Sequence, residues 1–224
     1  MSANITKLTA ADLAALLCAR ICHDLVGPVG ALETGLDLLN DEDNLDMHDD
    51  AIELIKVGAG QASAKLKFLR IAFGAGGSAP AVMACEELER LGRGVYPDGK
   101  VVFDWQMEVD GLSKPASRVL LNLVMLSVQT IPLGGTVLVN ASIKDDGEVG
   151  ENTEISLSCT GNNARLDPAI AKTLAGGAPE DGFSGRTIQP FYTGMIAREA
   201  GGTITSRVVI EGEIVAFTAE IPNT

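Results

Sequence analysis

The chain has 224 residues, of which 46% are hydrophobic and 21% charged, a balance that predicts a folded core and excludes a largely disordered chain. Its formal net charge of −13 would repel phosphate backbones, so we expect protein partners rather than nucleic acid. The four cysteines form no CxxC pair, the start shows no secretory signal, and no uninterrupted apolar run is long enough to span a bilayer. These features predict a cytoplasmic protein with reduced thiols.

Two long helices are predicted at the start of the chain. The first covers residues 9–40, with Thr9 as its N-cap, and the second covers residues 47–73. The glycine-rich segment 74–80 predicts a linker. The expected organisation is therefore a helical hairpin over residues 1–76, followed by a second domain over residues 80–224.

The second domain alternates between strand and helix patterns and predicts an α+β fold. Strands are expected over residues 100–109, 134–143 and 153–161, and helices over residues 115–131, 168–177 and 190–202. A closing β-hairpin is expected over residues 202–221, with its turn at Glu211-Gly212.

His23 lies in the first helix, within ARICHDLVGP (residues 19–28). At about 100° per residue, it falls about 160° from Leu25, the centre of an apolar stripe. The other members of that stripe are Cys18, Cys22, Val29, Leu32, Leu36 and Leu39. This placement disfavours a buried core histidine. It also disfavours a zinc site with the two cysteines, because their thiols point away from the imidazole.

The remaining interpretation is that His23 is a nucleophile. An imidazole is mostly neutral at pH 7, and Asp24 could bind its second ring nitrogen and stabilise the charge that develops on attack. Pro28 removes the amide that would bond back to Asp24, and Gly27 and Gly30 leave bare backbone on the histidine side. An exposed site of this kind suits a group that is handed to a second protein.

The motif His-Asp-x-x-x-Pro on a helical hairpin resembles the phosphoacceptor region of sensor histidine kinases, and the whole chain resembles the ChpT histidine phosphotransferase family. The resemblance is carried by ARICHDLVGP (19–28), GLDLL (35–39), IAFGA (71–75) and FDWQ (103–106). It implies a dimeric four-helix bundle followed by an α/β sandwich that resembles a degenerate histidine-kinase ATPase domain.

The nucleotide-binding boxes of histidine kinases are not intact in the second domain. Leu126 replaces the asparagine that usually binds magnesium, Cys159 replaces the aspartate that binds adenine, and Asn163 replaces a glycine. The glycines of the third box are missing from residues 187–190. Without an oxygen ligand for the metal, an acceptor for adenine or glycines that close over phosphates, we expect no use of ATP. We expect no cofactor or metal in this chain, and Mg²⁺ from the partner receiver domain.

The resemblance implies a phosphorelay function. His23 would take a phosphoryl group from the aspartyl phosphate of a hybrid histidine kinase receiver domain (CckA-like) and pass it to response regulators (CtrA-like and CpdR-like) in cell-cycle regulation. Asp24 would orient the ring. Further residues that could contact the phosphate or the partner are Arg20, Gly27, Leu16, Ala19 and Val26. No role is assigned to His48.

The apolar stripe also predicts a homodimer, because two helices alone cannot bury it. Its leucines at positions 25, 32, 36 and 39 are expected to pair with Ile52, Ile55, Ala59, Ala62, Leu66 and Leu69 of the second helix. Two alternatives to the phosphorelay function remain open: an ATP-dependent sensor histidine kinase, and a non-catalytic dimeric scaffold protein.

Overall fold

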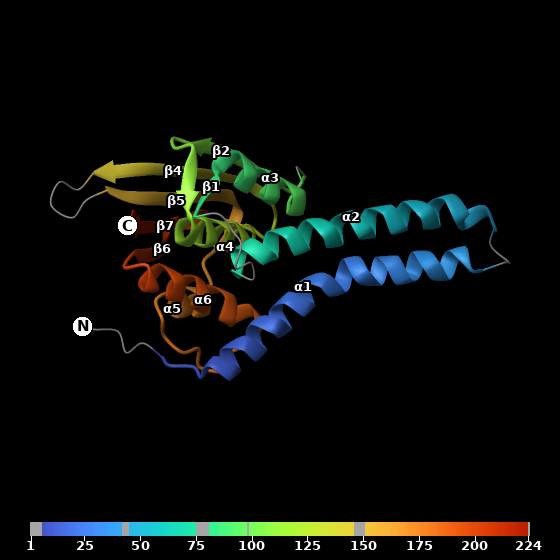
Figure 1. Cartoon of the computed structure of the whole chain (residues 1–224), viewed down its shortest axis with the longest axis horizontal. Helices are drawn as coiled ribbons and strands as arrows, with labels where there is room; N and C mark the ends of the chain where they lie inside the picture. Colours follow the sequence, from blue (N-terminus) through green and yellow to red (C-terminus); the bar gives the residue numbers. More distant parts are fainter. Residues whose placement is uncertain (1–5, 42–44, 75–80, 98, 146–150, 224) are drawn as a thin grey trace.

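A long helical hairpin projects from an α/β sandwich in the computed structural model of the chain (Figure 1). The model describes residues 6–41, 45–74, 81–97, 99–145 and 151–223. The predicted linker therefore lies, from residue 75 onward, outside the described residues, as do residues 42–44 of the acidic segment between the helices.

The hairpin consists of α1 (Ala10–Leu39) and α2 (His48–Ala72), joined through a short 3₁₀ turn (Leu45–Met47). Both helices match the prediction to within one residue at each end. Thr9 caps α1, because its extended backbone lets the side-chain oxygen accept the amide hydrogen of Asp12 at 3.1 Å.

Two glycines set how closely the helices approach. A Cβ at Gly58 of α2 would lie 2.9 Å from the carbonyl oxygen of Pro28, and a Cβ at Gly35 of α1 would lie 2.6 Å from Cγ1 of Ile55. Neither position can hold a larger side chain without moving a helix. The small residues around position 58 therefore serve close helix packing, whereas Gly60 faces open space.

Much of the predicted apolar stripe is not covered within the chain. Cys18 and Cys22 are exposed, as are Val29 and Leu36, and α2 exposes Ile52 and Leu66. The contacts between α1 and α2 instead use Pro28, Gly35, Ala51 and Gly58, which are buried. One chain thus leaves an apolar face along both helices.

By length and composition, α1 is one helix within the described part of the chain that could cross a membrane, although very little of it is buried. The helix is not an uninterrupted apolar run, because charged residues such as Arg20 and Asp24 lie within it. The close contacts of α1 with α2 around Gly58 are those of a helix in a bundle.

The sandwich is built on a five-stranded sheet with the order β2-β4-β5-β7-β6. Strands β2 (Val101–Met107) and β4 (Gly135–Asp145) are parallel, and the pairs that include β5 (Glu151–Ala164), β7 (Gly212–Pro222) and β6 (Thr203–Ile210) are antiparallel. A separate pair of short strands joins β1 (Val82–Ala84) to β3 (Gly111–Ser113). The fold is α+β, with the parallel pair at one edge of the sheet.

The core lies between this sheet and three helices, α4 (Lys114–Thr130), α5 (Pro168–Leu174) and α6 (Gly185–Glu199). Helix α4 is buried on nearly every side because it also lies against the end of α2. Helix α3 (Cys85–Val95), together with β1 and β3, has no counterpart among the predicted elements. Helix α6 begins five residues before the predicted start at Pro190, at a reciprocal cap between Ser184 and Thr187.

Candidate active site

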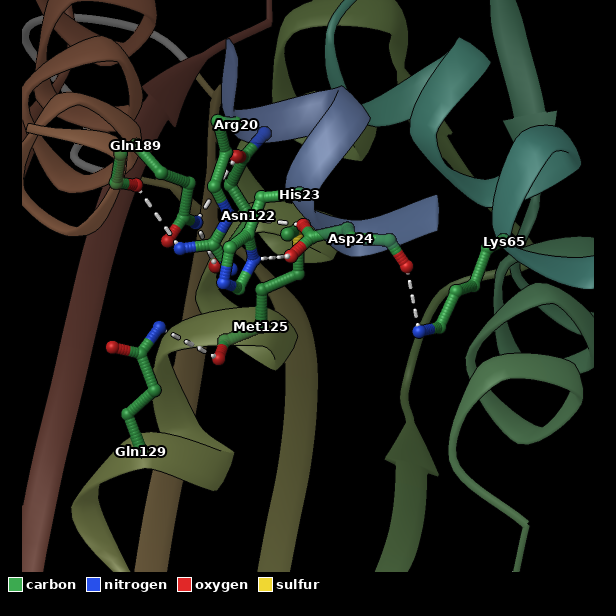
Figure 2. Close-up of polar contacts among 9 residues, drawn as sticks. Arg20, His23, Asp24, Lys65, Asn122, Met125, Gln129 and Gln189 are labelled. Atoms are coloured by element: carbon green, nitrogen blue, oxygen red, sulfur yellow. Dashed lines mark hydrogen bonds and ion pairs between the residues drawn. The ribbon is translucent and has the colours of Figure 1, made fainter. Parts of the chain in front are cut away.

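His23 extends from α1 into solvent, with 82% of its side chain exposed. Its Nδ1 lies 3.3 Å from Oδ1 of Asp24, and its Nε2 makes no hydrogen bond with any described residue (Figure 2). The contact with a carboxylate favours the tautomer that carries the proton on Nδ1. The lone pair on Nε2 is then free and accessible from outside the protein.

Asp24 connects His23 to Arg20. Its second carboxylate oxygen, Oδ2, accepts a hydrogen bond from Nε of Arg20 at 2.9 Å, and only 17% of the Asp24 side chain is exposed. A half-buried carboxylate that is hydrogen-bonded to a half-buried arginine keeps its orientation better than a free surface group does. The structure therefore fixes the group that contacts the imidazole.

Arg20 also joins the hairpin to the sandwich. Its Nη1 donates a hydrogen bond of 3.1 Å to the carbonyl oxygen of Gly185, the first residue of α6. The side chain is 15% exposed, so these contacts cover most of Arg20, which was proposed as a phosphate or partner contact. Arg20 therefore links the Asp24 carboxylate to the start of α6.

A second polar network ties the end of α2 to the sandwich. The Asn122 side chain, which is buried in α4, donates a hydrogen bond of 2.8 Å to the carbonyl oxygen of Ala72, and Gln189 of α6 donates to the backbone oxygen of Asn122 at 2.9 Å. Nearby, the hydroxyl of Tyr192 donates to the carbonyl oxygen of Phe73 at 2.8 Å and accepts from Arg118. The hairpin is thus held to the sandwich at both α1 and α2.

A cavity of about 320 Å³ lies behind the site, between the hairpin and the sandwich. Its polar lining includes Arg20, Asp24 and Lys65, and Tyr96 forms part of its wall. Burial raises the pKa of Tyr96 to about 12, and the nearby Asp24 carboxylate adds to this increase. Tyr96 therefore remains a neutral phenol at physiological pH.

Lys65 of α2 was not identified from the sequence. Its Nζ donates a hydrogen bond of 2.8 Å to the backbone carbonyl oxygen of Asp24 (Figure 2). The sequence did contain a signal, because Pro28 leaves that carbonyl without its helical donor. What it lacked was the register of the two helices, which decides which α2 side chain lies opposite.

The other residues proposed as partner contacts differ in how far they are exposed to solvent. Val26 is 68% exposed, Ala19 and Gly27 are exposed, and Leu16 is half-buried. A Cβ at Gly27 would meet no atom within 4 Å, so the packing of this chain does not require glycine there. These residues give the histidine side of α1 a small, partly apolar surface.

The residues at the degenerate kinase boxes are used for packing. Leu126 and Cys159 are fully buried, and burial raises the pKa of the Cys159 thiol to about 11. Residues 187–190 form part of α6 rather than a loop. Asn163 keeps the left-handed backbone of a glycine position, with φ of 58°. In the described part of the chain, no three His, Cys, Asp or Glu side chains are grouped as metal ligands would be.

Comparisons with known proteins identify the family. Residues 85–211 match the family model described as the histidine phosphotransferase C-terminal domain. The chain is 36% identical over 220 residues to the protein phosphotransferase ChpT of Brucella abortus (strain 2308), a match that covers 98% of this chain and 100% of that protein. The chain therefore belongs to the ChpT-like family of histidine phosphotransferases.

One solved structure agrees with this assignment. The structure of a bacterial phosphotransferase is 33% identical and superimposes with a TM-score of 0.80, covering 96% of this chain and 98% of the other. Full-length ShkA in complex with AMPPNP is a more distant match, with 20% identity and a TM-score of 0.48 over 96% of this chain and 46% of that one.

Proposed function

We propose that the protein carries a phosphoryl group from the aspartyl phosphate of one receiver domain to the aspartate of another, with His23 as the covalent intermediate. The observation that supports this most directly is the His23 ring itself: Nδ1 faces Asp24 and Nε2 is free in solvent. An exposed nucleophile can react only when a partner brings the phosphoryl group to it. The family provides the reaction class, and the geometry indicates the residue.

The step requires no external oxidant or nucleotide. Nε2 of His23 attacks phosphorus, the N–P bond forms, and the bond from phosphorus to the receiver's aspartate oxygen breaks, which leaves a free carboxylate. The ring then carries positive charge, and the Asp24 carboxylate at Nδ1 stabilises it. The second transfer reverses these bond changes with a different receiver. Mg²⁺ is expected to come from the receiver domain.

Each domain has a part in this proposal. Residues 1–76 would form the dimerisation and histidine-phosphotransfer unit, and residues 80–224 a degenerate kinase-like sandwich that holds the receiver from a second side. The exposed apolar face along α1 and α2 supports a homodimer with a four-helix bundle. The proposed partners are the hybrid-kinase receiver and response regulators implied by the resemblance, with the protein in the cytoplasm.

The experiment that tests this function follows a labelled phosphoryl group from a purified phosphorylated receiver to a second receiver. His23→Ala should abolish transfer, and its melting temperature should stay within 1–2 °C of wild type, because an exposed side chain contributes little to stability. Transfer that continues with His23→Ala would show that His23 is incidental, as in a scaffold protein.

The alternative of an ATP-dependent kinase is tested in the same preparation. Labelled ATP with Mg²⁺ should leave the protein unlabelled, because the box positions hold Leu126 and Cys159 in the core. Label on His23 from ATP would instead establish a kinase.

A further inference from the structure

Pro28 creates a specific problem in the backbone of α1. In a regular helix, the amide of residue 28 would donate a hydrogen bond to the carbonyl oxygen of Asp24. Proline has no amide hydrogen, and its ring pushes against that same carbonyl. Pro28 is buried against α2, so its position is fixed. The carbonyl of Asp24 therefore needs another donor.

Lys65 supplies that donor from α2. Its Nζ lies 2.8 Å from the Asp24 carbonyl oxygen, although the two residues are 41 positions apart in sequence. Among the described residues, the Asp24 carbonyl oxygen is the hydrogen-bond partner seen for the Lys65 amine. A hydrogen bond from a charged amine is stronger than one from a neutral donor.

The position of Lys65 argues against direct contact with a phosphoryl group on His23. In Figure 2, Asp24 lies between the two side chains, with the imidazole on one side and the amine on the other. Lys65 also lines the cavity between the hairpin and the sandwich. Its effect on His23 must therefore pass through Asp24.

We propose that Lys65 is a positioning residue for phosphotransfer: by replacing the hydrogen bond that Pro28 removes, it fixes the backbone of Asp24 and so directs the Asp24 carboxylate toward Nδ1 of His23. This inference rests on the proposed role of His23. It gives the proline of the motif a physical function, because the freed carbonyl becomes the attachment point for the second helix.

The structure offers a rescue experiment. Lys65→Met keeps the aliphatic stem and removes the donor, whereas Pro28→Ala restores an amide that can bond to Asp24 from within α1. If Lys65 acts through that carbonyl, the double variant Pro28→Ala/Lys65→Met should recover what Lys65→Met loses. A lysine that acted through its charge on the phosphoryl group or on a receiver would not be rescued in this way.

Single-turnover transfer from a phosphorylated receiver gives the first measurement. Lys65→Met should lower the maximal rate about tenfold and change the half-saturating receiver concentration less than twofold. The maximal rate of Lys65→Arg should be within threefold of the wild-type rate. The maximal rate of the double variant should be within threefold of the Pro28→Ala rate. Lys67→Met is the matched control, because Lys67 is exposed two positions further on, and its rate should equal that of wild type.

Two outcomes would overturn the role of Lys65. One is a raised half-saturating concentration with an unchanged maximal rate, which would place Lys65 in receiver binding. The other is a double variant as slow as Lys65→Met.

The ¹⁵N NMR signals of the His23 ring test whether Lys65 positions Asp24 without relying on a transfer assay. The Nδ1 signal should shift in Lys65→Met and return in the double variant, and an unchanged signal in Lys65→Met would overturn the role. If wild type transfers nothing, or if His23→Ala still transfers, the proposed function fails, and these signals still report whether Lys65 positions Asp24.

Discussion

Asp24→Asn removes the charge from the group that contacts His23. The substituted side chain keeps an oxygen that can accept a hydrogen bond from Nδ1, whereas its amide nitrogen can no longer accept from Arg20, so the negative charge and the Arg20 contact are lost together. At the observed 3.3 Å, the attraction between a unit negative charge and a fully developed positive charge on the ring is about 1.3 kcal/mol for an effective dielectric constant of 80 and about 2.5 kcal/mol for 40. Since about 1.4 kcal/mol corresponds to a tenfold change in rate, the substitution should slow phosphotransfer by about 10-fold to 70-fold.

The assay is single-turnover transfer from a phosphorylated receiver at saturating concentration, measured at low and high salt. The difference between Asp24→Asn and wild type should narrow only modestly with added salt, because the two groups are in direct contact. Asp37→Asn is the matched control, since Asp37 is an exposed carboxylate further along the same helix. A rate for Asp24→Asn within twofold of wild type would refute the electrostatic role assigned to Asp24.

Three further predictions concern packing, assembly and pH. Asn122→Leu removes the donor to the Ala72 carbonyl and should lower the free energy of unfolding, measured in urea, by about 2–3 kcal/mol. Asn162→Ala at an exposed position should change it by less than about 0.5 kcal/mol. Equal effects of the two substitutions would contradict the role of Asn122 in joining the hairpin to the sandwich. Leu36→Asp on the exposed apolar face should convert a dimer to a monomer in light scattering. Thr34→Asp, on the opposite side of α1, should leave the dimer intact. A dimer that survives Leu36→Asp would exclude this face as the interface. Burial raises the pKa of the Cys85 and Cys159 thiols to about 11. The unfolded chain therefore releases these protons first, and stability that is present below about pH 9 should fall as the pH rises toward 11; a urea unfolding series that shows rising stability over this range would contradict the argument.

The sequence predicted the helices of the hairpin well because their signals are local. The cap at Thr9 depends on Asp12, three residues away, and the apolar period extends over the whole of α1. Helix α6 shows the limit of this reasoning. Pro190 was interpreted as the first residue of the helix, but the reciprocal cap between Ser184 and Thr187 starts it earlier, and the proline lies inside.

In the candidate site too, features set by one helix could be predicted, whereas contacts between elements could not. The helical wheel placed His23 away from the apolar stripe, and the structure shows an exposed ring, because direction around one helix follows from residue spacing alone. The partners that Asp24, Arg20 and Asn122 find in other elements could not be predicted. Lys65, Gly185 and Ala72 come from other elements, and their positions depend on how those elements pack.

In the proposed function, the one free nitrogen of His23 has a kinetic consequence. A ring with a single accessible lone pair admits one protein at a time, so the phosphoryl donor must leave before the recipient can approach. Turnover then follows a ping-pong scheme, and an excess of unphosphorylated recipient competes with the donor for the same ring. The carrier takes part in both exchanges, so the direction of net flow depends on the amounts of phosphorylated and unphosphorylated receivers and on the transfer equilibrium of each with His23.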